Sequence, residues 1–318
     1  MRIGTFNHAD LMLQQMLRQQ VEMSETQTKI TSGKKYSDVQ GFGSKSAHLV
    51  NSHSLLNQIE GFRDANNALK GRLSAFDTGL SELETIGGEL RDAIQHSRAL
   101  ENGTGLASEV SGLLERAASV LNTRFEGRFL FGGTNTDTPP AQVTNEAEIL
   151  AVAEPPAGQF FGDSGRVPSV RLDERATIEV GVAASQVAGD LMHSMQRILM
   201  FANGTLPAGA GAFAPAGSLE GQLTDEQVDF LSGELTQVFS AIDQLQTAAT
   251  DNGLDIKAVE SVQSRLEEQT ISLTEIISNQ EDVDLADVAT KLNQQQLTLE
   301  ASIRMIAEMR NLSILNVL

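Results

Sequence analysis

All seven prolines of this 318-residue chain lie in one stretch, between residues 139 and 215. Proline ends a helix because it lacks a backbone N–H and its ring clashes with the preceding turn. The proline-free regions on either side can therefore form long helices, whereas the stretch between them cannot. This distribution predicts a helical N-terminal part, an irregular middle and a helical C-terminal part.

Apolar residues on the N-terminal side recur with helical spacing. In the first predicted helix they form two adjacent rows, Ala9, Met16, Met23 and Ile30 beside Phe6 and Leu13. Gly33 is placed to end this helix. A second helix is predicted from about residue 44 to 98, with apolar spacings of three and four that favour coiled-coil packing and only Asn66 and Gly87 interrupting them. It would extend roughly 80 Å at 1.5 Å per residue. A third helix is predicted over 106–121.

The C-terminal side shows the same spacing. Thr224 and Gln227 form a candidate capping box at the start of a helix. Apolar residues three and four apart follow to residue 245, and Asp251-Asn252-Gly253 predicts a turn. Beyond it, one apolar row recurs every seven residues through Leu285, Leu292, Leu299 and Ile306, and the chain ends in an apolar tail.

The proline-containing middle alternates apolar and polar residues. Two such runs, 167–172 and 176–182, predict a hairpin that turns at residues 173–175. A short amphipathic helix is predicted over 189–201 and a loop over 203–217. The expected fold is mainly α: a long antiparallel coiled-coil or helical bundle built from both chain halves, with a small β-rich insert at one end. The expected boundaries are 1–44, 45–137, 138–186, 187–284 and 285–318.

The first and last of these segments have no internal partner for their apolar rows. An apolar seam without a partner does not offset the entropy lost on ordering, so both segments are expected to stay disordered in the monomer and to fold on assembly. The predicted assembly interface consists of Phe6, Leu13, Met16, Met23, Ile30, Leu285, Leu292, Leu299, Ile306, Leu312, Leu315 and Leu318.

The stretch 128–140 (RFLFGGTNTDTPP) ends the N-terminal helices with a glycine pair and a proline pair. Bulky side chains gather just before it, in a chain with only 4% aromatic residues. We expect Phe125, Phe129, Leu130 and Phe131 to anchor the insert on the helices; a simple buried strand leaving the core is the alternative.

Composition excludes several functions. A net charge of −19 argues against nucleic acid, whose phosphates need a basic surface. The chain has no cysteine, its first residues show no cleaved secretory signal, and no apolar run is long enough to span a membrane. His48 and His53 lack metal-site spacing, and the Gly41–Ser46 segment has Ser44 where a phosphate loop needs glycine. We therefore expect no enzyme, no metal and no cofactor.

Four blocks resemble the flagellin superfamily. They are the Met1-Arg2-Ile3 start followed by a Gln-rich helix, the Ile30–Lys35 segment, the 252–267 region with Arg265-Leu266-Glu267, and Glu281–Ala286 with the apolar terminus. The Phe129–Gly133 element followed by Thr136–Pro140 looks like the members that join the hook to the filament rather than filament flagellins. Residues 35–46 depart from the family pattern, which has an Arg-Pro-Ser-Asp-Asp-Pro stretch there.

The resemblance implies a structural subunit of the extracellular bacterial flagellum, exported unfolded by the flagellar type III apparatus. Its implied partners are a ring of its own copies, the first hook-associated protein, flagellin, and a cytosolic export chaperone that binds its C-terminal helix, with no nucleic acid and no membrane. A flagellin-like filament subunit and a cytoplasmic coiled-coil scaffold are the alternatives.

Overall fold

The computed structural model describes residues 2–153, 160–205 and 219–315, and within these ranges the side chains from Leu11 to Glu308 except Met12. The predicted loop 203–217 falls mostly outside the described residues. The helices are α1 (Arg2–Ser32), α2 (Ser46–Ala99), α3 (Leu106–Leu121), α4 (Glu146–Ala151), α5 (Ala184–Val187), α6 (Gly189–Ala202), α7 (Asp225–Glu281) and α8 (Leu285–Leu315), with a 3₁₀ helix η1 (Val39–Lys45). The strands are β1 (Arg124–Phe125), β2 (Arg128–Phe129), β3 (Ser169–Arg171) and β4 (Thr177–Glu179). The expectation of a mainly α chain with a small β insert is confirmed.

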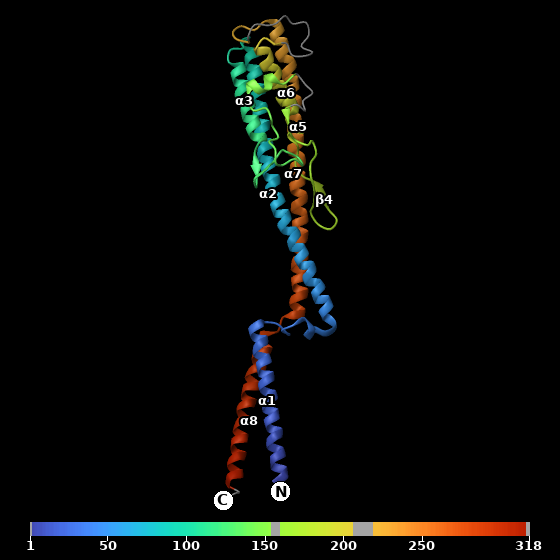
Figure 1. Ribbon diagram of the computed structural model, residues 1–318, viewed down its shortest axis with the longest axis vertical. Helices are drawn as coiled ribbons and strands as arrows, with labels where there is room; N and C mark the ends of the chain where they lie inside the picture. The colour runs from blue at the N-terminus through green and yellow to red at the C-terminus, as the bar shows by residue number, and fades with distance from the viewer. Residues whose placement is uncertain (1, 154–159, 206–218, 316–318) are drawn as a thin grey trace. The chain divides into compact units, whose positions relative to one another are not determined.

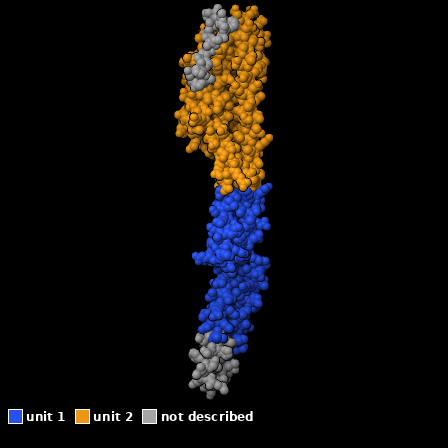
Figure 2. Space-filling model, turned by 90° about the vertical axis from the view of Figure 1, so that its right-hand side faces the viewer, with its two compact units in different colours: residues 1–60, 267–318 blue, residues 61–266 orange. Residues whose placement is uncertain are grey.

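The chain forms two compact units, which Figure 2 colours separately. Unit 1 comprises residues 1–60 and 267–318, and unit 2 comprises residues 61–266. The two boundaries fall inside α2 and α7, so each unit contains part of both helices.

In unit 2, α2 and α7 run antiparallel, as predicted, and α3 and α6 pack beside them (Figure 1). Polar contacts set the register: Gln246 bonds Glu84 at 2.6 Å, and Lys70 pairs with Glu260 at 2.6 Å. Since the higher number on one helix meets the lower number on the other, the two directions are opposed. Leu, Ile, Val, Met and Ala supply most of the core, among them Leu80, Leu83, Leu90, Leu114, Met192, Leu231 and Leu245.

The two residues that interrupt the apolar pattern of α2 both have a packing role. Asn66 is fully buried, and its side-chain amide donates a 3.0 Å hydrogen bond to the Leu172 carbonyl in the turn of the β3–β4 hairpin. Gly87 leaves room for Ile242 of α7, because a Cβ there would lie 2.9 Å from Ile242 Cγ1. The first interruption therefore binds the insert, and the second allows the long helices to approach each other.

The predicted turn at residues 251–253 is wrong, because α7 continues through it for 57 residues. Asn252 points into the helix interface, where it is 4% exposed and donates a 3.0 Å hydrogen bond to the Leu73 carbonyl of α2. A buried amide that finds such a partner is compatible with a continuous helix, and tertiary packing overrides the local turn preference of Asp-Asn-Gly.

Other predicted starts and stops are confirmed. Gly33 ends α1 with φ +71°. At the start of α7 the Thr224 N–H donates to the Gln227 side chain at 2.9 Å, and the Gln227 N–H donates to the Thr224 hydroxyl at 3.3 Å. This reciprocal pair is a capping box, which satisfies two amide groups that the helix itself leaves without partners.

The predicted hairpin is present, with Val170 opposite Ile178, although its strands are shorter than expected. Asp173 closes its turn by accepting from the amides of Arg175 and Ala176 at 2.7 and 2.6 Å. The segment lies along the side of the helices rather than at one end, since it meets α2 at Asn66 and the buried Gln196 of α6 donates to the Ile149 carbonyl at 2.9 Å.

A second hairpin was not predicted. In β1 and β2, Arg124 lies opposite Phe129 and Phe125 opposite Arg128. Glu126 (φ +50°) and Gly127 (φ +80°) form the two-residue turn, in which both positions need positive φ. The Arg-Phe pairs on both sides of this Gly-containing dipeptide were the available signal.

Candidate assembly surfaces

The terminal helices α1 and α8 lie side by side within unit 1 (Figure 1). The Ser302 hydroxyl of α8 contacts Gln19 Oε1 of α1 at 3.4 Å, and the sequence directions of the two helices are opposed. Among the described side chains of this pair, only Thr26 and Val288 are buried, at 5% and 8% exposure. Two helices alone cannot enclose the seam between them.

The predicted interface residues divide into three groups. Half-buried residues are Met16, Met23, Ile30, Leu292, Leu299 and Ile306. Leu13 and Leu285 are exposed, at 47% and 54%. Phe6, Leu312, Leu315 and Leu318 lie outside the described side chains. The structure thus brings one row of each helix toward the α1–α8 seam.

A second apolar surface lies outside that seam, and the sequence prediction included only Leu13 of it. Leu17 and Val21 continue from Leu13 at a spacing of four residues and are 50% and 59% exposed. On α8, Leu297 is 68% exposed. We call Leu13, Leu17 and Val21 the outer row of α1. The spacing of four residues was a readable signal, since such residues share one helix face.

Two connecting segments hold unit 1 together between its helices. Residues 33–35 and 281–283, which we call the clasp, are joined by two backbone hydrogen bonds, Lys35 N–H to Glu281 carbonyl at 2.7 Å and Val283 N–H to Gly33 carbonyl at 2.9 Å. The Lys35 amino group donates to the carbonyls of Asn279 and Gln280 at 2.8 and 3.1 Å, and so satisfies the carboxyl end of α7.

Glu281 is the charged centre of the clasp. Its side chain is 9% exposed and contacts the Lys34 amino group and His53 Nε2, each at 2.7 Å. Burial raises the pKa of the Glu281 carboxyl, but the hydrogen bonds and charges of Lys34 and His53 outweigh burial, so the pKa lies below its ordinary value. The folded clasp therefore favours the ionised carboxylate.

We expect acid to open the clasp. A carboxyl whose pKa is lower in the folded state contributes stability above its unfolded pKa, and this stability is lost as the pH falls through the folded value. The loss should begin below about pH 4, near the ordinary pKa of Glu. The fluorescence of Tyr36 can report the opening of the clasp, because Tyr36 directly follows Lys35 of the clasp. It is the one Tyr in a chain without Trp, so its signal is not mixed with that of another such residue. Glu281→Gln is the control: an acid change as large as in the parent chain would contradict the assignment.

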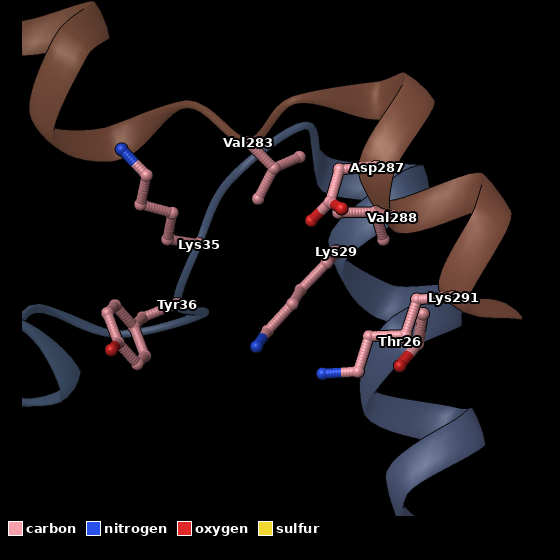
Figure 3. Close-up of a pocket in the computed structure, with 8 residues that line it drawn as sticks. All are labelled: Thr26, Lys29, Lys35, Tyr36, Val283, Asp287, Val288 and Lys291. Carbon is pink, nitrogen blue, oxygen red and sulfur yellow. The ribbon is translucent and has the colours of Figure 1, made fainter. Parts of the chain in front are cut away.

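Next to the clasp, a pocket of about 190 Å³ lies between α1, residues 35–36 and the start of α8. Figure 3 shows its lining, which is Thr26, Lys29, Lys35, Tyr36, Val283, Asp287, Val288 and Lys291. The amino groups of Lys29 and Lys291 end on the same side of the pocket, whereas Lys35 points away from them. The pocket belongs to unit 1 alone.

The four predicted anchor residues lie in unit 2. Phe129, Leu130 and Phe131 are buried, and Phe125 is half-buried. The Phe131 ring meets Phe76 of α2 edge-on, with ring centroids 5.3 Å apart, and the Phe131 carbonyl accepts the Ala184 N–H at 2.9 Å. Gly133, with φ +64°, lets the chain approach the Arg166 carbonyl, which a Cβ would meet at 2.3 Å. This run therefore contacts α2 at Phe76, the interior of the insert at Arg166 and the end of the insert at Ala184.

In the described part of the chain, no cluster of three His, Asp or Glu side chains could hold a metal ion. None of the described helices is long and apolar enough to cross a membrane.

Comparison with known proteins shows similarity to flagellar proteins. Residues 3–136 match the model of the bacterial flagellin N-terminal helical region. Searched by sequence, curated proteins yield no match. Among solved structures, the fold is similar to a Vibrio parahaemolyticus protein assigned as flagellar hook-associated, with a TM-score of 0.58, 16% identity and coverage of 74% of this chain and 97% of that one. It is also similar to FlgL of Xanthomonas campestris, with a TM-score of 0.54, 11% identity and coverage of 72% and 99%.

The resemblance to flagellins that the sequence blocks suggested is confirmed over the N-terminal region. At these identities the two solved structures support the fold. Residues 3–136 of the chain are thus similar to the N-terminal helical region of bacterial flagellins, and the fold of the chain is one also found in these flagellar proteins.

Proposed function

We propose that the chain is a structural subunit of the bacterial flagellum and forms the junction between hook and filament, as a ring of identical copies. The family of residues 3–136 supports a flagellar role, and the fold similarity to a hook-associated protein and to FlgL favours the junction. The role is mechanical rather than catalytic. Its place is outside the cell, between the first hook-associated protein and the first layer of flagellin.

The observation that carries the proposal is the thin packing of the terminal helices. With only Thr26 and Val288 buried among the described side chains of α1 and α8, the pair gains little from contacts within one chain. Each fully buried Leu or Met side chain contributes roughly 1.5–3 kcal/mol, and these helices leave most of that gain unrealised. Neighbouring copies would cover the remaining apolar surface, including the outer row of α1.

The same packing supports folding coupled to assembly. Segments 1–44 and 285–318 would order only when copies meet, and the chain would pass through the export apparatus unfolded, with a chaperone on its C-terminal helix. Limited proteolysis tests this in the purified monomer. If residues 1–44 and 285–318 resist cleavage as well as α2 and α7 do, the terminal segments do not await assembly.

A filament subunit is the competing function, because the matched family model is that of flagellin. Deleting the gene separates the two. A junction subunit predicts intact hooks with flagellin released to the medium. Growth of long filaments from the purified chain alone would instead identify a filament subunit.

Replacing Leu17 and Val21 together by Asp should abolish attached filaments and leave the monomer folded. Both side chains are at least half exposed in the single chain, so the charges cost little there, but they would be buried at an interface between copies. Electron microscopy of cells and circular dichroism of the secreted protein measure the two effects.

The matched control is Gln14→Asp with Gln20→Asp, which adds the same charge at exposed polar positions of α1. It should keep filaments attached. Normal filaments in the Leu17→Asp/Val21→Asp strain would show that the outer row of α1 faces solvent in the assembled structure.

A further inference from the structure

We propose that the pocket beside the clasp binds carboxylates of a second copy of this chain. The ammonium groups of Lys29 and Lys291 on one copy would receive the exposed glutamates Glu267, Glu268 and Glu275 from α7 of the next. This inference rests on the proposed function, since it specifies one contact within a ring of copies.

The pocket carries more positive than negative side chains: three lysines and one aspartate line it. Of its three lysines, Lys35 is already bound to the carbonyls at the end of α7. Lys29 and Lys291 form no ion pair with any described residue, although Asp287 lines the same pocket. Two ammonium groups therefore face the cavity with one carboxylate in its wall, and the Lys29 nitrogen lies 5.7 Å from the centroid of the Tyr36 ring.

The pocket wall beside these two lysines also contains apolar and aromatic side chains. Val283 and Val288 form apolar parts of the wall, and Tyr36 is held by an edge-on contact with Phe42, with centroids 5.0 Å apart. Lys29 is half-buried and Lys291 is exposed, so an ion pair to Lys29 is screened by solvent less than a pair between two fully exposed side chains. An anionic side chain of a partner is the ligand that this combination suits.

The same unit carries the complementary charge. From residue 266 to 290 the chain has seven acidic residues and no lysine, arginine or histidine. Within this stretch Glu267, Glu268 and Glu275 are exposed and form no ion pair with a described residue. Residues 29–45 contain four lysines and one aspartate. Both surfaces belong to unit 1, so every copy presents one of each.

Two different, complementary surfaces on one chain allow a head-to-tail contact between copies. Such a heterologous contact closes into a ring when the rotation from copy to copy allows it, and a ring is the arrangement that the proposed function requires. Exposed ion pairs add little affinity, but they set register and exclude wrong orientations. In this arrangement the apolar rows supply the affinity, and the lysine pocket sets the register between neighbours.

Charge reversal tests the contact in cells that lack the gene. Lys29→Glu/Lys291→Glu should lose attached filaments to the level of the deletion. Adding Glu267→Lys, Glu268→Lys and Glu275→Lys to the same chain should restore them, because each pocket would then meet an oppositely charged α7. The control adds Glu25→Lys, Glu300→Lys and Glu308→Lys instead, three exposed glutamates of α1 and α8, and should not restore filaments.

The outcomes separate this inference from the function beneath it. If deleting the gene leaves filaments attached, the junction function fails. If deletion removes filaments but Lys29→Glu/Lys291→Glu keeps them, the pocket is not a contact and the inference is overturned. Failure of the Glu267→Lys/Glu268→Lys/Glu275→Lys set to restore them, or equal rescue by the control, also overturns it.

A second measurement needs no substitution. A zero-length carbodiimide joins lysines to carboxylates in direct contact, so in isolated flagella it should link Lys29 or Lys291 to residues 267–275 of another copy. Cross-links from these lysines only to other segments would overturn the inference. So would saturable binding of inorganic phosphate to the pocket, followed by Tyr36 fluorescence, without any link between copies; that result identifies a site for a free anion.

Discussion

Replacing Phe131 by Ala should lower the free energy of unfolding of the chain by about 3–5 kcal/mol, the usual cost of removing a buried Phe ring from a core. The side chain is 0% exposed and packs edge-on against Phe76 at 88°. Because its backbone carbonyl also holds the amide of Ala184, neighbouring segments cannot collapse easily into the space left behind. Urea unfolding followed by the circular dichroism of the helices measures the loss.

Gly79 provides a control within the same contact. A Cβ at this position of α2 would lie 2.8 Å from Phe131 Cζ, so Gly79→Ala strains the parent core. In the Phe131→Ala background that space is empty. There the higher helix propensity of Ala over Gly, roughly 0.8–1 kcal/mol, can stabilise α2. We therefore expect Gly79→Ala to be more favourable in the Phe131→Ala background than in the parent chain. Strictly additive effects would show that the ring does not occupy this site.

Removing the charge of Arg197 alone should also lower the free energy of unfolding strongly. Its Nε lies 2.7 Å from Glu234 Oε1, with the side chains 17% and 4% exposed, and its guanidinium lies 5.9 Å from the centre of the Phe230 ring. Arg197→Met removes the cation that lies 2.7 Å from the buried Glu234 carboxylate, and breaking a buried ion pair in this way typically costs about 3–5 kcal/mol. The measurement is again the urea midpoint.

The double variant Arg197→Met/Glu234→Leu, compared with Arg197→Met, tests whether the loss of stability comes from the unbalanced charge. It removes both charges and fills the site with apolar groups, so most of the lost stability should return. A double variant as unstable as Arg197→Met would mean that the pair acts through packing or through other hydrogen bonds rather than through charge.

Local sequence signals located most element ends. Gly33 and the Thr224–Gln227 pair act within a few residues of themselves, so their neighbours in the chain are enough to predict them. The Asp251-Asn252-Gly253 turn failed for the opposite reason. Whether Asn252 ends the helix depends on an acceptor on another helix, the Leu73 carbonyl, 179 residues away in the chain.

The apolar surfaces of unit 1 likewise could not be assigned from local sequence signals alone. Helical spacing identifies two apolar rows on α1, one with a spacing of seven residues and one with a spacing of four, and the row that meets α8 depends on how the helix is rotated. The structure turns Met16 and Met23 toward α8 and leaves Leu17 and Val21 exposed. Spacing alone cannot make this choice, because each row is periodic by itself.

By itself, the sequence determined the class of fold, the two helical regions and the resemblance to flagellins, because proline positions, apolar periodicity and short motifs are properties of neighbouring residues. Only the tertiary structure decided that α7 is continuous, that the insert lies along the side of α2, and that the clasp and the lysine pocket exist. Those features join residues such as Lys34 and Glu281, which are 247 positions apart. Contacts over that separation arise from packing, whose outcome no local pattern encodes.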